Sequence, residues 1–161
     1  MTEAFLSQAM TQYGDAVYRL ALCRLQNTAD AEDVYQETFL RLFQERQAPT
    51  WEPERLKAWL LRVAMNKCTD IARKRKRSPA CTLEDLPDLS MEGGYGYIEL
   101  WDAVSRLPER YRVVFHLYYG EGFKTQEIAD LLSMPPATVR VNLNRARTTL
   151  RKELTSNDKI S

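Results

Sequence analysis

The chain has 161 residues, of which 44% are hydrophobic and 28% are charged, and its formal net charge is +1 at pH 7. This length fits one domain or two small ones, and the even charge balance excludes a polycation. No apolar run is long enough to cross a membrane, so we expect no membrane insertion and a cytoplasmic location. The three cysteines lack the spacing of a metal site, so we expect neither a metal nor any other cofactor.

Apolar residues recur at helical spacing along most of the chain, and no segment alternates convincingly like a strand. Three helices are predicted in the first half of the chain, over about residues 5–26, 30–45 and 53–77. Asp30 is the expected N-cap of the second helix, and Pro53 suits the first turn of the third. Cys23 and Cys68 fall at apolar helix positions, and we expect both thiols to be buried.

Residues 78–97 interrupt this pattern with two Pro, three Gly and four acidic residues, which is typical of a linker. Cys81 lies in this segment without a resolving cysteine beside it, so a redox role is not favoured. Helices are predicted again over about residues 98–106, 108–119, 125–132 and 136–154. His116 occupies a structural position in one of them. The predicted fold is therefore all-α, with an N-terminal domain (1–77), an acidic linker and a C-terminal domain (98–161).

The last two predicted helices, with the turn "SMPP" between them, have the form of a helix-turn-helix. An apolar stripe along the longer helix is formed by Val139, Leu143, Ala146 and Leu150. In this motif the start of the second helix contacts base edges in the major groove, and basic side chains contact phosphates. The residues expected on duplex DNA are Ala137, Thr138, Arg140, Val141, Asn144, Arg145, Arg147 and Arg151. The alternative is a solvated basic helix end that suits the helix dipole.

Four blocks of the sequence follow one another in this order: "DAEDVYQETFLRLF", "WLLRVAMNKCTDIARKRKR", "LPERYRVVFHLYYGEGFKTQEIADLL" and "TVRVNLNRARTTLRK". Together they resemble the bacterial extracytoplasmic-function (ECF) sigma factors over residues 4–154. The resemblance implies a non-enzymatic subunit of RNA polymerase whose N-terminal domain binds the core enzyme and reads and opens the −10 element of promoter DNA. It also implies that the C-terminal domain reads the −35 element. Whether an anti-sigma factor binds this chain stays open.

One face of the second predicted helix lies opposite its apolar stripe and carries Asp33, Gln36, Glu37 and Leu40. An exposed leucine among carboxylates suits a partner helix, because the leucine can anchor in the partner and the carboxylates can pair with basic side chains. The resemblance assigns this face to core RNA polymerase. The alternative is a solvated charged face.

The resemblance assigns the third predicted helix, with the loop before it, to the opened −10 strand. Single strands are held by basic grooves with aromatic side chains on which bases stack. The basic run from Arg73 to Arg77 continues this helix, which fits such a groove better than a nuclear-import signal. The expected −10 contacts are Trp51, Arg62, Asn66, Lys67, Arg73, Lys74, Arg75, Lys76 and Arg77.

The start of the recognition helix departs from the family pattern. In "ATVRVN", Ala137, Val141 and Asn142 stand where the family commonly has a glycine, a serine and an arginine. The loss of the polar serine and arginine changes the groups that would face the bases. The −35 preference of this chain therefore cannot be inherited from its relatives.

Two other classes of function compete with this one. A stand-alone helix-turn-helix regulator would use the same DNA-binding helix without polymerase. A metal-dependent enzyme would take its ligands from Asp30, Glu32, Asp33 and Glu37. Such an enzyme would need a second cluster of ligands in helical register elsewhere, which the sequence lacks, so we expect no catalytic residues.

Overall fold

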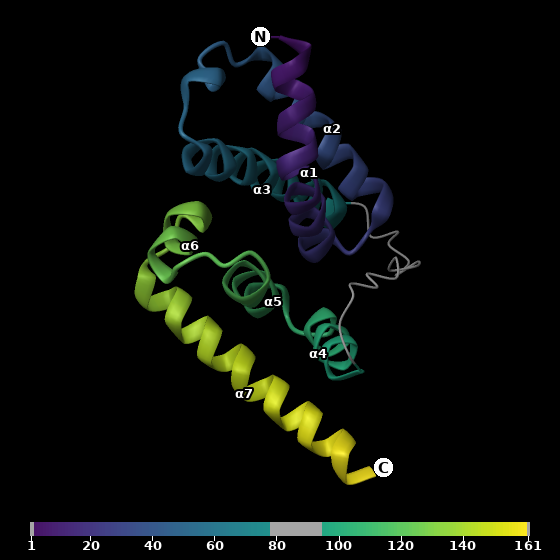
Figure 1. The fold of residues 1–161 in the computed structure, drawn as a ribbon. Helices are drawn as coiled ribbons and strands as arrows, with labels where there is room; N and C mark the ends of the chain where they lie inside the picture. Colours follow the sequence, from purple (N-terminus) through teal and green to yellow (C-terminus); the bar gives the residue numbers. More distant parts are fainter. Residues whose placement is uncertain (1, 78–94, 161) are drawn as a thin grey trace. The chain divides into compact units, whose positions relative to one another are not determined.

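The computed structural model describes residues 2–77 and 95–160, so most of the predicted linker, including Cys81, lies outside the described residues (Figure 1). The chain divides into two compact units, one made of the helices before residue 78 and one made of the helices after residue 94. The described residues of both units form helices and turns without strands, which confirms the predicted all-α fold. None of the described helices combines the length and the hydrophobicity needed to cross a membrane.

The first unit is a bundle of α1 (Glu3–Leu25), α2 (Thr28–Gln44) and α3 (Pro53–Arg77), with a short 3-10 turn, η1 (Ala48–Thr50), before α3. These bounds lie within two residues of the predicted ones. All three helices pack on one another, and the fully buried side chains of their shared core include Val17, Leu20, Leu22, Val34, Thr38, Leu42, Leu60 and Leu61. Cys68 is buried as predicted, whereas Cys23 is only partly buried.

The start of α2 differs from the prediction in its capping residue. Asn27 is the N-cap: its backbone is extended (φ −149°), and its Oδ1 accepts a hydrogen bond of 2.9 Å from the backbone N–H of Asp30. The prediction of Asp30 as N-cap was wrong because the chain is already helical at Thr28. The Asp30 carboxylate instead forms an ion pair with Arg75 near the end of α3. This ion pair joins the basic end of α3 to the start of α2.

Gly14 allows a close contact between α1 and α2. A Cβ atom at Gly14 would lie 3.1 Å from both Cε2 and the hydroxyl oxygen of Tyr35. The Tyr35 ring in turn packs on Phe39, with ring centroids 4.8 Å apart. Glycine lowers the intrinsic helix propensity of α1, but it leaves room for the tyrosine ring.

The second unit contains α4 (Tyr95–Ser105), α5 (Glu109–Phe115), a π-helical turn η2 (His116–Gly120), α6 (Thr125–Leu132) and α7 (Pro136–Ile160). The long helix α7 packs against α4, α5 and α6 (Figure 1). One cluster of the core is formed by Ala103, Val104, Leu107, Tyr111, Phe115, Ala146 and Leu150. The second unit is therefore organised around α7.

Three helix bounds in this unit differ from the prediction by three residues or more. α4 begins at Tyr95, three residues before the predicted start, so the last residues assigned to the linker are helical. The predicted helix 108–119 changes to a π-helical turn at His116, and α7 continues past residue 154 to Ile160. His116 is buried, and its Nε2 lies 3.3 Å from Oε1 of Glu121, which agrees with a structural position.

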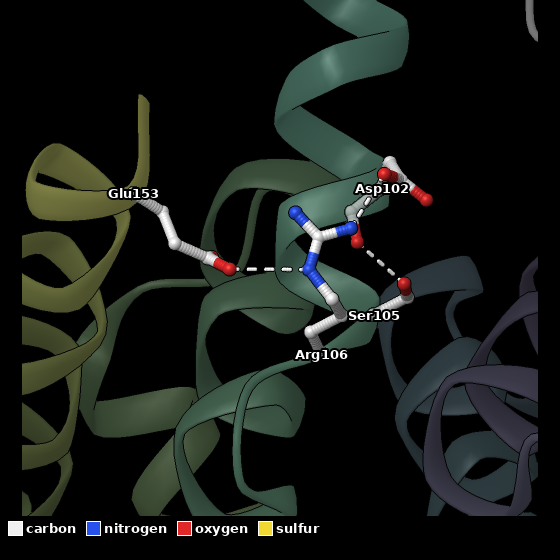
Figure 2. A network of polar contacts seen from close by, with 4 residues as sticks. All are labelled: Asp102, Ser105, Arg106 and Glu153. Atoms are coloured by element: carbon white, nitrogen blue, oxygen red, sulfur yellow. Dashed lines mark hydrogen bonds and ion pairs between the residues drawn. The ribbon is translucent and has the colours of Figure 1, made fainter. Parts of the chain in front are cut away.

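A polar network connects the end of α4 to α7, as Figure 2 shows. Arg106 donates from Nη1 to Oδ2 of Asp102 at 2.6 Å and from Nε to Oε1 of Glu153 at 3.1 Å. The hydrogen bonds to Asp102 and Glu153 raise the pKa of the Arg106 guanidinium above its ordinary value. Because these side chains are largely exposed, we expect each pair to stabilise the unit by about 1 kcal/mol or less.

The contact at Gly14 leads to a stability prediction. Gly14→Ala should raise the free energy of unfolding by about 1 kcal/mol through helix propensity, but only where the Tyr35 ring does not oppose the new methyl group. We therefore expect the gain in a Tyr35→Leu background and its loss or reversal in the wild-type background. Urea unfolding followed by circular dichroism would measure the four proteins of this cycle. The same effect of Gly14→Ala in both backgrounds would contradict the assigned contact.

The ion pair at the end of α3 leads to a second prediction. Arg75→Ala should lower the free energy of unfolding by about 1–2 kcal/mol, because it leaves the Asp30 carboxylate, whose side chain is only 17% exposed, without its cation. Arg73→Ala is the matched control, since Arg73 is exposed on the same helix and its removal should change stability by less than about 0.5 kcal/mol. Equal effects of the two substitutions in chemical unfolding would refute a structural role for Arg75.

Candidate functional site

The outer face of α2 is exposed along its length. Asp33 and Gln36 are exposed, Leu40 is 53% exposed, and Glu37 is partly exposed and accepts a hydrogen bond of 3.2 Å from Nε of Arg41. The opposite face is buried through Ala31, Val34, Thr38, Phe39 and Leu42. α2 therefore brings together the four residues predicted to bind a partner.

Phe43 extends this face and was not predicted. Its side chain is 49% exposed and follows Leu40 by three residues, so the two apolar side chains are neighbours on the helix surface. The spacing of residues 36, 40 and 43 is visible in the sequence and is the signal that could have added Phe43 to this face. The exposed face, which we call the α2 face, consists of Asp33, Gln36, Glu37, Leu40 and Phe43.

The loop before α3 contains a stack of aromatic and basic groups. The rings of Trp51 and Trp59 lie with centroids 5.5 Å apart, and Cζ of Arg55 lies 4.6 Å from the centroid of Trp51. Trp51 was predicted as an aromatic surface for a base. It is partly buried and contacts these two neighbours, which were not predicted.

The polar residues predicted on α3 do not form one uniform group. Arg62, Asn66, Arg73 and Lys74 are exposed, and Lys67 is partly exposed. Arg75 differs from them because its guanidinium is paired with Asp30. The side chains of Lys76 and Arg77 lie outside the described residues, although the helix itself continues to Arg77.

The helix-turn-helix is formed by α6 and α7. The carboxylate of Glu127 accepts a hydrogen bond of 2.9 Å from the backbone N–H of Lys124 and thereby caps α6. Ser133 ends α6 in the left-handed conformation (φ 55°), and the chain turns there into α7. The predicted core stripe of α7 is buried at every position, namely Val139, Leu143, Ala146 and Leu150.

The predicted base-reading residues lie on the exposed side of α7. Ala137, Thr138, Arg140 and Asn144 are exposed, and Val141 is 46% exposed. Asn142 differs from them, since it is buried with 7% exposure. Of the departures from the family pattern, Ala137 and Val141 therefore change the exposed surface, whereas Asn142 faces the protein interior.

Two of the predicted phosphate-binding arginines are held by tyrosines of the same unit. Arg147 donates from Nε to the hydroxyl of Tyr119 at 2.8 Å. The buried Tyr111 accepts hydrogen bonds from Arg110 and Arg145, and these lower the pKa of its phenol. Cζ of Arg110 also lies 4.7 Å from the centroid of the Tyr111 ring. Arg145 and Arg147 thus have partners in the α5–η2 segment, and Arg145 is exposed, as is Arg151.

The comparison with known families and proteins covers both units. Residues 9–78 match the family described as Sigma-70 region 2, and residues 97–150 match Sigma-70, region 4. RNA polymerase sigma factor SigV of Bacillus subtilis is 30% identical over 159 residues, which are 98% of this chain and 95% of that protein. ECF RNA polymerase sigma factor SigW of Bacillus subtilis is also 30% identical, over 88% of this chain and 84% of that protein.

The fold agrees with a solved sigma factor. The structure of RpoE in complex with the anti-sigma factor NepR from Bartonella quintana superposes with a TM-score of 0.77, over 96% of this chain and 98% of that chain. The sequence identity there is 22%, so this likeness concerns the fold. The matches to regions 2 and 4 show the family, and the likeness to SigW, which covers most of both chains, shows the ECF group. The chain belongs to the sigma-70 family, in its ECF group, and is a non-enzymatic initiation factor that binds core RNA polymerase and directs it to promoter DNA.

Proposed function

We propose that the two units divide the work of promoter recognition. In this proposal residues 1–77 bind core RNA polymerase and the opened −10 element, residues 98–161 read the −35 element as duplex, and residues 78–97 link them. The observation that carries the proposal is the arrangement of buried and exposed side chains on α2 and α7. Each helix has a buried apolar stripe and, opposite to it, an exposed face that carries the predicted partner-binding residues.

The chemistry of the α2 face supports its assignment to core polymerase. Leu40 and Phe43 are large apolar side chains that the fold leaves exposed, and burial against a partner would remove their apolar surface from water. The carboxylates of Asp33 and Glu37 lie on the same face and favour basic groups on the partner. Glu37 already pairs with Arg41, so binding would exchange one cation for another.

The first unit also offers the groups that a single strand requires. Arg62, Arg73 and Lys74 supply exposed positive charge along α3, and Asn66 supplies a hydrogen-bonding amide between them. Trp51 supplies an aromatic ring in the preceding loop. Arg75 contributes less positive charge to this surface than its neighbours, because the Asp30 carboxylate is paired with its guanidinium.

The second unit offers a recognition helix of standard form. Arg140 and Asn144 lie near the start of α7 on its exposed side, where a helix in the major groove meets base edges. Arg145, Arg147 and Arg151 lie farther along the helix, where they suit phosphate contacts. A stand-alone regulator would use this helix in the same way, but the α2 face would then have no role.

Location and regulation complete the proposal. A cytoplasmic location follows from the partners, since core polymerase and promoter DNA are cytoplasmic in bacteria. The solved relative RpoE is bound to the anti-sigma factor NepR. We include an anti-sigma factor among the proposed partners of this chain on that likeness, and expect it to compete with core polymerase or with DNA.

The polymerase assignment is tested by charge reversal on α2. Asp33→Arg together with Glu37→Arg should weaken binding to core polymerase by more than about tenfold, because like charges would then face each other in the complex. Asp15→Arg, an exposed reversal on α1, is the matched control and should bind as the wild type does. Competition for purified core enzyme would measure all three proteins. Wild-type competition by the double variant, with its helicity intact, would show that another face binds polymerase.

The DNA assignments are tested by removing one amide from each unit. Asn144→Ala should change which −35 sequences are used, because a good base contact discriminates by about 1–3 kcal/mol, and it should leave the −10 preference alone. Asn66→Ala should lower strand opening or change the −10 preference, with −35 binding unchanged. Promoter-library selection would measure the preferences, and permanganate footprinting would measure opening. A shift of −10 preference caused by Asn144→Ala would overturn the division between the units.

A further inference from the structure

We propose that Tyr119 is a positioning residue for −35 recognition: through Arg147 it holds the amide of Asn144 so that the NH₂ group, and not the oxygen, is presented to the DNA. Asn144 would then read a hydrogen-bond acceptor on a base and discriminate against cytosine. The inference rests on the proposed function of α7. It concerns Tyr119 on η2, outside the helix-turn-helix, and it predicts the kind of base edge that Asn144 contacts.

The guanidinium of Arg147 joins the two residues. Its Nε donates to the Tyr119 hydroxyl at 2.8 Å, and its Nη1 donates to Oδ1 of Asn144 at 3.0 Å. Both donors belong to the rigid, planar guanidinium of Arg147, so fixing one of these hydrogen bonds also orients the other. Arginine carries donors only, so the Asn144 atom that faces it must be the oxygen. The chemistry of the pair therefore determines the orientation of this amide.

Tyr119 is itself held in place, although 49% of it is exposed. Its ring packs on Phe115 with centroids 4.6 Å apart, and Phe115 is part of the buried core. Its ring also packs edge to face with the ring of Tyr118, with centroids 4.8 Å apart. Cζ of Arg147 lies 5.7 Å and 5.5 Å from the ring centroids of Tyr118 and Tyr119, respectively. The core thus holds Phe115, Phe115 holds the Tyr119 ring, and Tyr119 holds Arg147.

The π-helical turn brings both tyrosines beside the same arginine. Successive side chains in an α-helix point about 100° apart, so two neighbours seldom contact one group. In η2 the rings of Tyr118 and Tyr119 both lie within cation–π range of Arg147. π-Helical turns are often found at functional sites, and here the turn supplies the contact that orients α7 side chains.

The fixed amide limits what Asn144 can read. An unrestrained asparagine contacts adenine through both edges, accepting from N6 and donating to N7. With Oδ1 turned toward Arg147, the edge presented to DNA is the NH₂ donor. Guanine, adenine and thymine each offer an acceptor in the major groove, whereas cytosine offers only its N4 amino donor. We therefore expect cytosine to be disfavoured at the contacted base, without a strong preference for adenine.

The experiment uses the full chain with core RNA polymerase and a promoter library randomised over the −35 element. Asn144→Ala first identifies the base position that depends on Asn144. Tyr119→Phe keeps the aromatic ring but removes the hydroxyl that accepts from Arg147. It should raise the use of adenine at that same position by about two- to tenfold, the effect of one hydrogen bond, because the released amide can turn both edges to the base.

Asn144→Asp supplies a second, independent readout. An aspartate still accepts from Arg147 but has no NH₂ group, so the preference at this position should shift toward cytosine, whose amino group can donate to a carboxylate. Tyr118→Phe is the matched control: it removes the hydroxyl of the neighbouring ring, which makes no hydrogen bond to Arg147 among the described contacts. It should leave the preference unchanged, and thermal melting would establish that every variant is folded.

The outcomes separate this inference from the proposed function. If Asn144→Ala changes −35 preference but Tyr119→Phe does not, or if Tyr119→Phe weakens all sequences equally, Tyr119 is not a positioning residue and the reading by α7 still stands. If neither Asn144→Ala nor Asn144→Asp changes −35 preference, the base-reading role of α7 residues fails, and the inference fails with it. A shift caused by Tyr118→Phe of the same size would also overturn it.

Discussion

The second unit depends on the burial of one apolar stripe along α7. Val139, Leu143, Ala146 and Leu150 are all buried, against α4, α5 and α6. The helix fixes the direction of each side chain relative to the others. Burial of this stripe therefore also determines which residues face water. Arg140, Val141 and Asn144 lie off this stripe and are exposed. The surface proposed to read the −35 element is thus a direct consequence of how the core forms.

Several arginines expected on nucleic acid also have partners inside their own unit. Arg75 pairs with Asp30, Arg145 donates to Tyr111, and Arg147 donates to Tyr119. A long basic side chain loses rotamer freedom when it binds a phosphate, and internal partners remove part of that freedom beforehand. Partners of opposite charge also offset the cation, as at Arg75, whereas a neutral tyrosine does not. The tyrosine-held arginines therefore keep their charge for a ligand.

The helices could be predicted from the sequence because their signal is local. Apolar spacing in α2 and α7 identified the buried stripes, and with them the exposed faces. The N-cap of α2 was assigned wrongly because Asn27 and Asp30 are both good capping residues, and the sequence does not say which of them is extended. The π-helical turn was also missed, since its residues fit the preceding helical pattern.

Contacts between distant residues could not be predicted in the same way. The ion pair of Arg75 and the hydrogen bond of Arg147 to Tyr119 depend on how whole helices pack, and no local pattern encodes that. Both arginines were expected among the DNA contacts, Arg75 in the basic run of the third helix and Arg147 on the side of the recognition helix away from its core. The packing distinguishes them from Arg73 and Arg140, which are exposed.

The stack at Trp51 bears on how tightly a nucleotide could be held there. Arg55 already lies 4.6 Å from the ring, so a base that stacks on this face would replace a guanidinium. Base–aromatic stacking is worth about 1–3 kcal/mol, and an exposed cation–π contact about 0.5–1 kcal/mol, so only the difference would favour capture. The displaced arginine would be released close to the sugar–phosphate chain of the arriving nucleotide. Capture at this loop would then be an exchange reaction, readily reversed until the backbone contact forms.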